Sequence, residues 1–306
     1  MNRLLTLVFL GVLATPAWAQ FASPDPARLR LSSANVFVLD AAADRQIYAK
    51  AADAVTPIAS VTKLMTAMVV LDANQALDET INVGIADLDL LKGSHSRLRL
   101  GSELPRGEML RLALMASENR AASSLARHYP GGTDACVEAM NRKAQSLGMA
   151  HTRFADPTGL SSDNVSTASD LARMVGAAAG YDLIRDATTT ASLYVEVQPT
   201  GRVLGYNNTN SLVRTAQWDI QLSKTGFIRE AGKCLVMLTN IASRPTVIVL
   251  LDSYGRLTRI GDANRVKYWL ETGESLPEAR AVKAKRFRGS MPPSATRTSA
   301  KAKTRA

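Results

Sequence analysis

The sequence has few of the residue types on which several classes of protein depend. Only 2 of its 306 residues are cysteine, 3 are histidine and 5% are aromatic. His95, His128 and His151 show no spacing typical of metal ligands, and we expect neither a metal nor a cofactor. Cys136 and Cys234 could form one disulfide bond in an oxidising compartment, and two free buried thiols are the alternative.

Long apolar runs are also missing. The most apolar segment, residues 4–14, is about 11 residues long, whereas roughly 20 are needed to cross a bilayer. It follows the basic Arg3 and precedes Ala17-Trp18-Ala19, which is the pattern of a secretory signal. We therefore expect residues 1–19 to be a signal peptide that is cleaved after Ala19, and a periplasmic protein, in preference to a membrane anchor.

Acidic residues are absent from the C-terminal end. Residues 280–306 contain nine lysines and arginines and no acid, although the whole chain has a net charge of +10. Subtracting those nine charges and that of Arg3 leaves a folded body without net charge, so a nucleic-acid partner loses its main support. Residues 276–306 are rich in Ala, Lys, Arg, Pro and Ser and predict a disordered basic tail, which could weakly contact an anionic wall or membrane surface.

The rest of the chain can bury a full core, because 46% of all residues are hydrophobic. Residues 34–40 and 45–49 alternate like a hairpin, and apolar residues from 61 to about 177 recur at helical spacing. Strand patterns return at 219–227, 233–241 and 246–252, before a last helix at 264–270, while 78–107 suggests loops and short helical turns. We expect one domain over 20–275, with an antiparallel sheet built from both chain ends and an inserted helical lobe.

One short motif suggests nucleophilic catalysis. Ser60-Val61-Thr62-Lys63 places a hydroxyl at the start of a helical pattern and an amine one turn later on the same face. A lysine in that position can take the serine proton once its pKa has been lowered enough for it to be neutral. Alone, the motif favours a helix cap followed by a solvent-facing lysine.

Two more motifs follow in order. Ser117-Glu118-Asn119 lies in the helical region, and Lys224-Thr225-Gly226 lies on the strand pattern that begins near Asp219. Together the three motifs form the Ser-x-x-Lys, Ser-x-Asn and Lys-Thr-Gly signature of penicillin-recognising serine enzymes. With a lysine available as the base, a Ser-His-Asp triad is not expected.

From about residue 30 to 272 the chain resembles the low-molecular-mass penicillin-binding proteins, and most closely their D-alanyl-D-alanine endopeptidase type. The resemblance extends to residues 59–68, 114–122, 154–160 and 222–227. It implies an α/β (α+β) fold of the penicillin-binding and beta-lactamase-like transpeptidase kind. Glu118 stands where many D,D-carboxypeptidases of this family have glycine, which favours the endopeptidase branch.

The resemblance also implies roles for the motif residues. Ser60 would attack the carbonyl of a penultimate D-alanine, Lys63 would be its base, and Ser117 and Asn119 would relay protons and orient the substrate. Lys224 and Thr225 would bind the substrate carboxylate, Gly226 would allow close approach, and the backbone N–H groups of Ser60 and Phe227 would hold the oxyanion. The partners would be peptidoglycan peptides and covalent beta-lactam inhibitors.

Several functions remain compatible with these motifs. A terminal D-Ala-D-Ala and a cross-link to diaminopimelate both place a carboxylate beside the scissile amide, so a D,D-carboxypeptidase is the nearest alternative to an endopeptidase. A non-catalytic wall-binding protein is another. A beta-lactamase is disfavoured because no Glu-x-x-Leu-Asn segment lies between the second and third motifs, where the acids Asp156 and Asp163 belong to the peptidase-like pattern.

Overall fold

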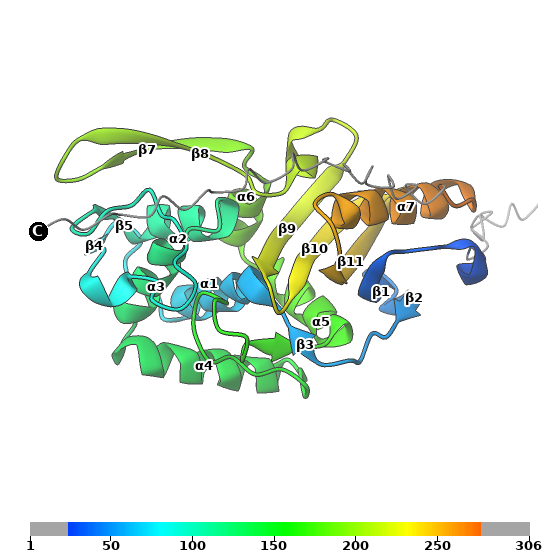
Figure 1. Cartoon of the computed structure of the whole chain (residues 1–306), viewed down its shortest axis with the longest axis horizontal. Helices are drawn as coiled ribbons and strands as arrows, with labels where there is room; N and C mark the ends of the chain where they lie inside the picture. The colour runs from blue at the N-terminus through cyan, green and yellow to red at the C-terminus, as the bar shows by residue number, and fades with distance from the viewer. Residues whose placement is uncertain (1–23, 277–306) are drawn as a thin grey trace, which may run out of the picture.

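The structure, a computed structural model, describes residues 24–276 (Figure 1). The expected signal peptide at 1–19 and all but the first residue of the expected tail at 276–306 lie outside the described residues. Within the described part, none of the helices has the length and apolar character that crossing a bilayer requires.

A five-stranded antiparallel sheet has the order β2, β1, β11, β10, β9. Its strands are β1 (Ser33–Asp40), β2 (Arg45–Lys50), β9 (Asp219–Ile228), β10 (Gly232–Ile241) and β11 (Arg244–Ser253). Because β1 pairs with β11, both ends of the chain build one sheet, as expected. The predicted hairpin is confirmed as β1 paired with β2, and the three predicted C-terminal strands are β9, β10 and β11.

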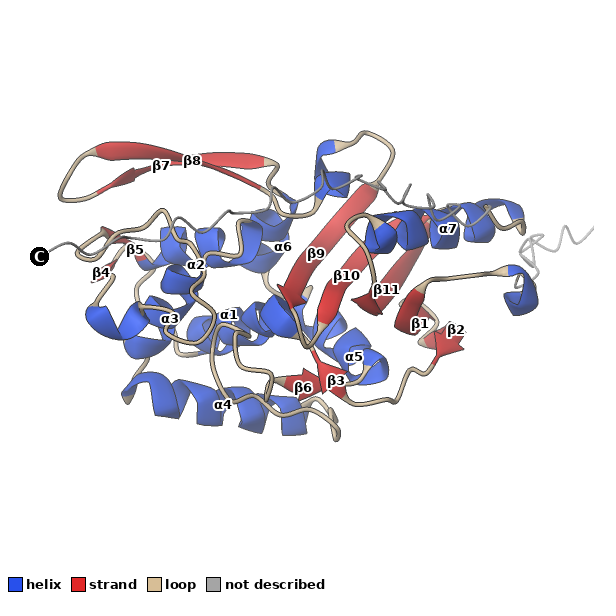
Figure 2. Ribbon diagram, in the orientation of Figure 1, coloured by secondary structure: helices blue, strands red, loops and turns tan. Residues whose placement is uncertain are grey.

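Both faces of the sheet are covered (Figure 2). Helix α7 (Thr258–Thr272) packs on one face, and α5 (Ala168–Ala178) packs with the helical lobe on the other. Side chains alternate accordingly, because successive residues of a strand point to opposite faces. Val36 and Val38 belong to the cluster around Trp269 of α7, whereas Phe37 packs against the other core.

The helical lobe is inserted between β2 and β9. Its remaining helices are α1 (Lys63–Asp72), α2 (Arg106–Met115), α3 (Asn119–Arg127), α4 (Gly132–Ser146) and α6 (Asp182–Thr189). Three small strand pairs accompany them: β3 (Thr56–Pro57) with β6 (Val165–Ser166), β4 (Thr80–Asn82) with β5 (Glu103–Pro105), and β7 (Ser192–Val197) with β8 (Arg202–Asn207).

One segment differs from its sequence-based prediction. Residues 78–107 contain the expected short helical turn, η3 (Ile85–Asp87), but also the paired strands β4 and β5. Each of these strands has three residues, which is too few to show an alternating pattern.

The two cysteines are buried free thiols, and burial raises their pKa, to about 12 for Cys136 and about 11 for Cys234.

A buried carboxylate joins α7 to the sheet. Asp262 is fully buried and accepts hydrogen bonds from the backbone N–H of Ser33 at 2.7 Å and from its hydroxyl at 2.6 Å. It also pairs with Arg265, one turn along the same helix, at 2.7 Å. Asp262 thus fixes α7 against the start of β1.

We expect Asp262→Ala to lower the free energy of unfolding by about 3–5 kcal/mol, because it leaves Arg265 buried without its charge partner. Glu271→Ala on the same helix removes a partly exposed ion pair with Lys267 and should cost no more than about 1 kcal/mol. Urea unfolding of the two variants measures both values. Equal losses would show that the Asp262 network does not fix the helix.

Candidate active site

Ser60 lies in a 3-10 turn, η2 (Ala59–Thr62), that runs directly into α1. The preceding residue, Ala59, has a φ of +49°, in the left-handed region that non-glycine residues rarely adopt. The hydroxyl of Thr62 donates to the Ala59 carbonyl at 2.8 Å and helps to hold this turn. The predicted position of Ser60, one turn before Lys63 at a helix start, is therefore confirmed.

Lys63 is an enclosed cation in contact with Ser60. Its side chain is 1% exposed, and its Nζ donates to Ser60 Oγ at 3.0 Å, to Asn119 Oδ1 at 2.7 Å and to the Thr158 carbonyl at 2.6 Å. Burial lowers the pKa of Lys63 to about 7, against the opposing charges of Asp156 and the more weakly acting Glu118 and Asp89. A large part of Lys63 is therefore neutral near neutral pH.

The second motif lies at the junction of α2 and α3. Ser117 occupies the link between the helices with a φ of +59°, and its Oγ accepts from Lys224 Nζ at 3.0 Å. Asn119 is the first residue of α3, and its Nδ2 donates to Ser94 Oγ at 2.8 Å. Glu118 is 7% exposed and accepts from the Arg120 backbone N–H as the N-cap of α3. The helix start thus orients Asn119 towards Lys63.

The third motif is on β9, the edge strand next to η2. Lys224 is 1% exposed and its Nζ also donates to the Thr225 carbonyl at 2.9 Å. Its pKa lies well below the usual value because of burial, then because of the nearby charges of Lys63 and Arg259. The hydroxyl of Thr225 donates to that of Thr209 at 2.6 Å. Lys224 therefore links the sheet to Ser117 in the helical lobe.

Two glycines permit the close approach of their segments to Ser60. A Cβ on Gly226 would lie 2.9 Å from the Ile58 carbonyl oxygen and 3.1 Å from the Ser60 nitrogen. Gly159 has a φ of +80°, and a Cβ there would lie only 2.0 Å from the Ala59 carbonyl oxygen. The turn that carries Ser60 is thus confined between β9 and the loop that contains Gly159.

Asp156 organises that loop. Its carboxylate accepts from the backbone N–H groups of Thr158, Gly159 and Ser161 at 2.6–2.9 Å, and from Asn164 Nδ2 at 2.6 Å. The same loop presents the Thr158 carbonyl to Lys63. Asp156 is therefore engaged in holding the loop.

The motif residues surround a pocket of about 730 Å³. Ser60, Ser117, Asn119, Thr225, Gly226 and Phe227 line it directly, while Lys63 and Lys224 lie behind Ser60 and Ser117. The ring of Phe227 is 55% exposed, with the Lys233 ammonium 4.0 Å from its centre. A separate hollow of about 400 Å³, near Arg45 and Thr272, contains none of these side chains.

Some residues of the site carried no sequence signal. Arg259, in the first turn of α7, lines the pocket, and its Nη1 donates to the Gly226 carbonyl at 3.3 Å. Its buried Nε has no hydrogen-bond partner among the described residues. The sequence predicted this helix only from residue 264, and a lone arginine before it looks like an ordinary surface residue. Ser94 and Thr209 likewise belong to no motif and reach the pocket only through folding.

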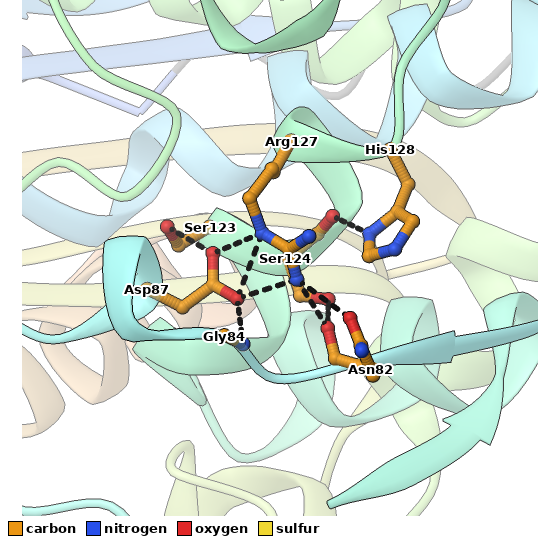
Figure 3. Close-up of polar contacts among 7 residues, drawn as sticks. All are labelled: Asn82, Gly84, Asp87, Ser123, Ser124, Arg127 and His128. Atoms are coloured by element: carbon orange, nitrogen blue, oxygen red, sulfur yellow. Dashed lines mark hydrogen bonds and ion pairs between the residues drawn. The ribbon is translucent and has the colours of Figure 1, made fainter. Parts of the chain in front are cut away.

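A polar network joins η3 to α3, the helix that begins at Asn119 (Figure 3). Asp87 accepts from the Gly84 N–H at 2.7 Å, from Ser123 Oγ at 2.9 Å and from Arg127 Nη2 at 2.9 Å. His128 contacts the Ser124 carbonyl at 2.8 Å through its ring nitrogen Nδ1.

Across residues 24–276 no group of three or more potential metal ligands is present.

We expect Gly226→Ala to slow the labelling of the Ser60 hydroxyl by an acylating probe by on the order of 100-fold, because the added methyl displaces the turn that carries Ser60. Gly159→Ala should lower the melting temperature as well, since its Cβ would overlap a backbone oxygen. Gly176→Ala is the control: nothing lies within 4 Å of its Cβ, and alanine suits its place in α5. Unchanged labelling in Gly226→Ala would contradict the role given to close packing here.

Known proteins resemble this chain over most of its length. The curated D-alanyl-D-alanine endopeptidase of Pseudomonas aeruginosa is 47% identical over 291 residues, covering 94% of each chain. That of Escherichia coli K12 is 48% identical over 252 residues, covering 82% of this chain and 81% of that protein.

Two solved structures, one of a DD-transpeptidase and one of a penicillin-binding protein, share the fold. The Streptomyces K15 DD-transpeptidase superimposes with a TM-score of 0.74 at 25% identity, over 79% of this chain and 98% of that one. Penicillin-binding protein D2 from Listeria monocytogenes, in its ampicillin-bound form, gives a TM-score of 0.68 at 26% identity with the same coverage.

The family model described as D-alanyl-D-alanine carboxypeptidase, peptidase S11, matches residues 20–255. The match spans the three motifs and every pocket residue except Arg259. These observations agree with the sequence-based expectation of a serine hydrolase with the penicillin-binding fold. The chain belongs to the peptidase S11 family of D-alanyl-D-alanine carboxypeptidases.

Proposed function

We propose that this protein is a periplasmic serine D,D-endopeptidase that hydrolyses D-alanyl-diaminopimelate cross-links of peptidoglycan through an acyl-enzyme on Ser60. The observation that carries the proposal is the contact of 3.0 Å between Ser60 Oγ and Lys63 Nζ, in a pocket where the pKa of Lys63 is about 7. The endopeptidase assignment rests on the two relatives of that name, at 47% and 48% identity.

The reaction begins with proton transfer from Ser60 to neutral Lys63. The serine oxygen attacks the carbonyl carbon of the D-alanine that precedes the scissile amide, forming a C–O bond and an oxyanion. The backbone N–H groups of Ser60 and Phe227 hold that oxyanion, and a single donor of this kind is typically worth about 3 kcal/mol. Two fixed N–H groups are suited to this because they need no reorganisation as charge develops.

Departure of the amine completes acylation. The C–N bond breaks as the nitrogen receives a proton from Ser117, which is in contact with Lys224. The proton that Lys63 took from Ser60 replaces the one that Ser117 gives up, so Lys63 is neutral again. Water then attacks the acyl-enzyme, with Lys63 again as base, and releases the D-alanine carboxylate and free Ser60. Asn119 keeps the Lys63 amine directed at Ser60 through its Oδ1 contact of 2.7 Å.

The carboxylate beside the scissile amide would be bound by Lys224, Thr225 and Arg259. The arrival of this negative charge raises the pKa of Lys224 and so restores a full positive charge where it is needed. Arg259 supplies a second cation whose buried Nε has no other partner among the described residues. Both a cross-link and a terminal D-Ala-D-Ala fit this binding, so a carboxypeptidase activity would use the same residues.

Two parts of this proposal depend on residues outside the described range. Periplasmic location follows from the expected signal peptide at 1–19, and the basic tail could bring the enzyme into weak contact with an anionic wall or membrane surface. Beta-lactams would acylate Ser60 as mimics of the D-alanyl substrate, as the family membership and the ampicillin-bound neighbour support.

The pH dependence of acylation tests the role of Lys63. Because only the neutral amine accepts the serine proton, the acylation rate should rise with pH and reach half its plateau near Lys63's pKa of about 7. The charge of Glu118 raises this pKa, so Glu118→Gln should move the midpoint to lower pH. Stopped-flow acylation with a fluorescent penicillin measures the midpoint. The distant Glu138→Gln should leave it in place, and an equal shift there would exclude a local effect.

Digestion of purified muropeptides tests the substrate. Wild-type protein should split cross-linked dimers into monomers, whereas Ser60→Ala should lose both this activity and penicillin labelling, with a fall in rate of about 10⁶-fold. Release of free D-alanine from pentapeptides alone would identify a carboxypeptidase. Labelling without either reaction would identify a non-catalytic binding protein, and dimer cleavage by Ser60→Ala would refute the mechanism.

A further inference from the structure

An ion pair connects the two walls of the pocket. Lys92, in the loop that follows η3, donates to Glu230, in the turn between β9 and β10, with 2.5 Å between Nζ and Oε1. Their side chains are 33% and 41% exposed, and both residues line the pocket that contains Ser60. We call Lys92 and Glu230 the cleft ion pair.

The position of the cleft ion pair follows from the direction of β9. In the proposed function, the carboxylate of the leaving residue contacts Thr225. The scissile carbonyl then lies beside Gly226 and Ser60. The chain then continues through Ile228, where the strand ends about 7 Å beyond Gly226 at roughly 3.3 Å per residue, to Glu230 in the turn. The cleft ion pair therefore lies on the acyl-donor side of Ser60.

The loop that carries Lys92 is held in place. The carboxylate of Asp89 accepts from the backbone N–H groups of Leu91 and Lys92 at 2.9 Å and of Ser94 at 2.7 Å. Ser94 in turn accepts from Asn119, and Asp87 secures η3 to α3 just before the loop (Figure 3). Lys92 therefore extends from a fixed loop towards the donor end of the pocket.

Lys92 and Glu230 are suited to give up their mutual contact and to bind a charged ligand instead. An exposed ion pair is weak in water, because solvent stabilises each partner alone. A substrate that brings opposite charges to both partners would lose little by opening it. The exposed Leu91 and the partly buried Leu160 line the same pocket and offer apolar surface for the hydrocarbon part of such a side chain.

Peptidoglycan that is cross-linked through diaminopimelate supplies this chemistry. The residue before the donor D-alanine is then the same diamino acid, and its far end carries an ammonium and a carboxylate on one carbon. We propose that Glu230 binds this ammonium and Lys92 this carboxylate, so that the cleft ion pair determines specificity for a zwitterionic donor side chain. This inference rests on the proposed function.

Chemically modified dimers test each contact separately. We expect acetylation of the donor ammonium to lower kcat/KM of the wild type by about five- to tenfold, and that of Glu230→Gln by less than about twofold. Amidation of the far-end carboxylate of the donor diamino acid should lower kcat/KM of the wild type by a similar factor. It should lower kcat/KM of Lys92→Gln by less than about twofold. Each variant should thus be insensitive to one modification and remain sensitive to the other.

The ion pair of Lys267 and Glu271 on α7 provides matched controls, with the same 2.5 Å separation outside the pocket. Lys267→Gln and Glu271→Gln should keep both wild-type penalties. Equal penalties in the wild type and the cleft variants, or no penalty in the wild type, would overturn the inference while leaving dimer cleavage intact. If the wild type is labelled by penicillin but does not cleave dimers, the proposed function itself is wrong, and the inference that rests on it has no basis.

Discussion

Two buried lysines at the junction of the lobes set the requirements that much of this structure meets. An enclosed ammonium without a carboxylate in contact is unstable unless polar groups replace water. Lys63 is therefore surrounded by three oxygen acceptors, and Lys224 joins Ser117 to the Thr225 carbonyl. The residual cost of burial lowers both pKa values, which is what allows a lysine to act as a base near neutral pH.

These acceptors have to come from separate parts of the chain, and the backbone is constrained where they meet. The loop held by Asp156 brings one carbonyl to Lys63, and it approaches so closely that only glycine fits at position 159. Ala59 and Ser117 have left-handed backbone conformations beside the pocket. Some unfavourable backbone geometry thus lies at the site, and the sheet and the two hydrophobic cores supply the stability that maintains it.

The regular elements could largely be predicted, because long segments repeat their apolar pattern. The hairpin, the three C-terminal strands and the helices after Ser60 correspond to clear periodicities. The pairs β4–β5 and β7–β8 were not predicted. The first is too short to show a pattern. In the second, β7 alternates, with Leu193, Val195 and Val197 on its more buried side, but β8 shows no such alternation, so the pairing of the two strands is not visible in the sequence.

The sequence by itself determined the three motifs, their order and their family resemblance, because the proposed nucleophile, base and anion-binding strand each require particular residue types at short spacing. Only the tertiary structure decided that Lys63 is buried and partly neutral. It also decided that Arg259 joins the pocket from α7 and that Lys92 meets Glu230 across it. Burial, desolvation and long-range contact are properties of packed elements, and no local pattern encodes which distant side chains will share a pocket.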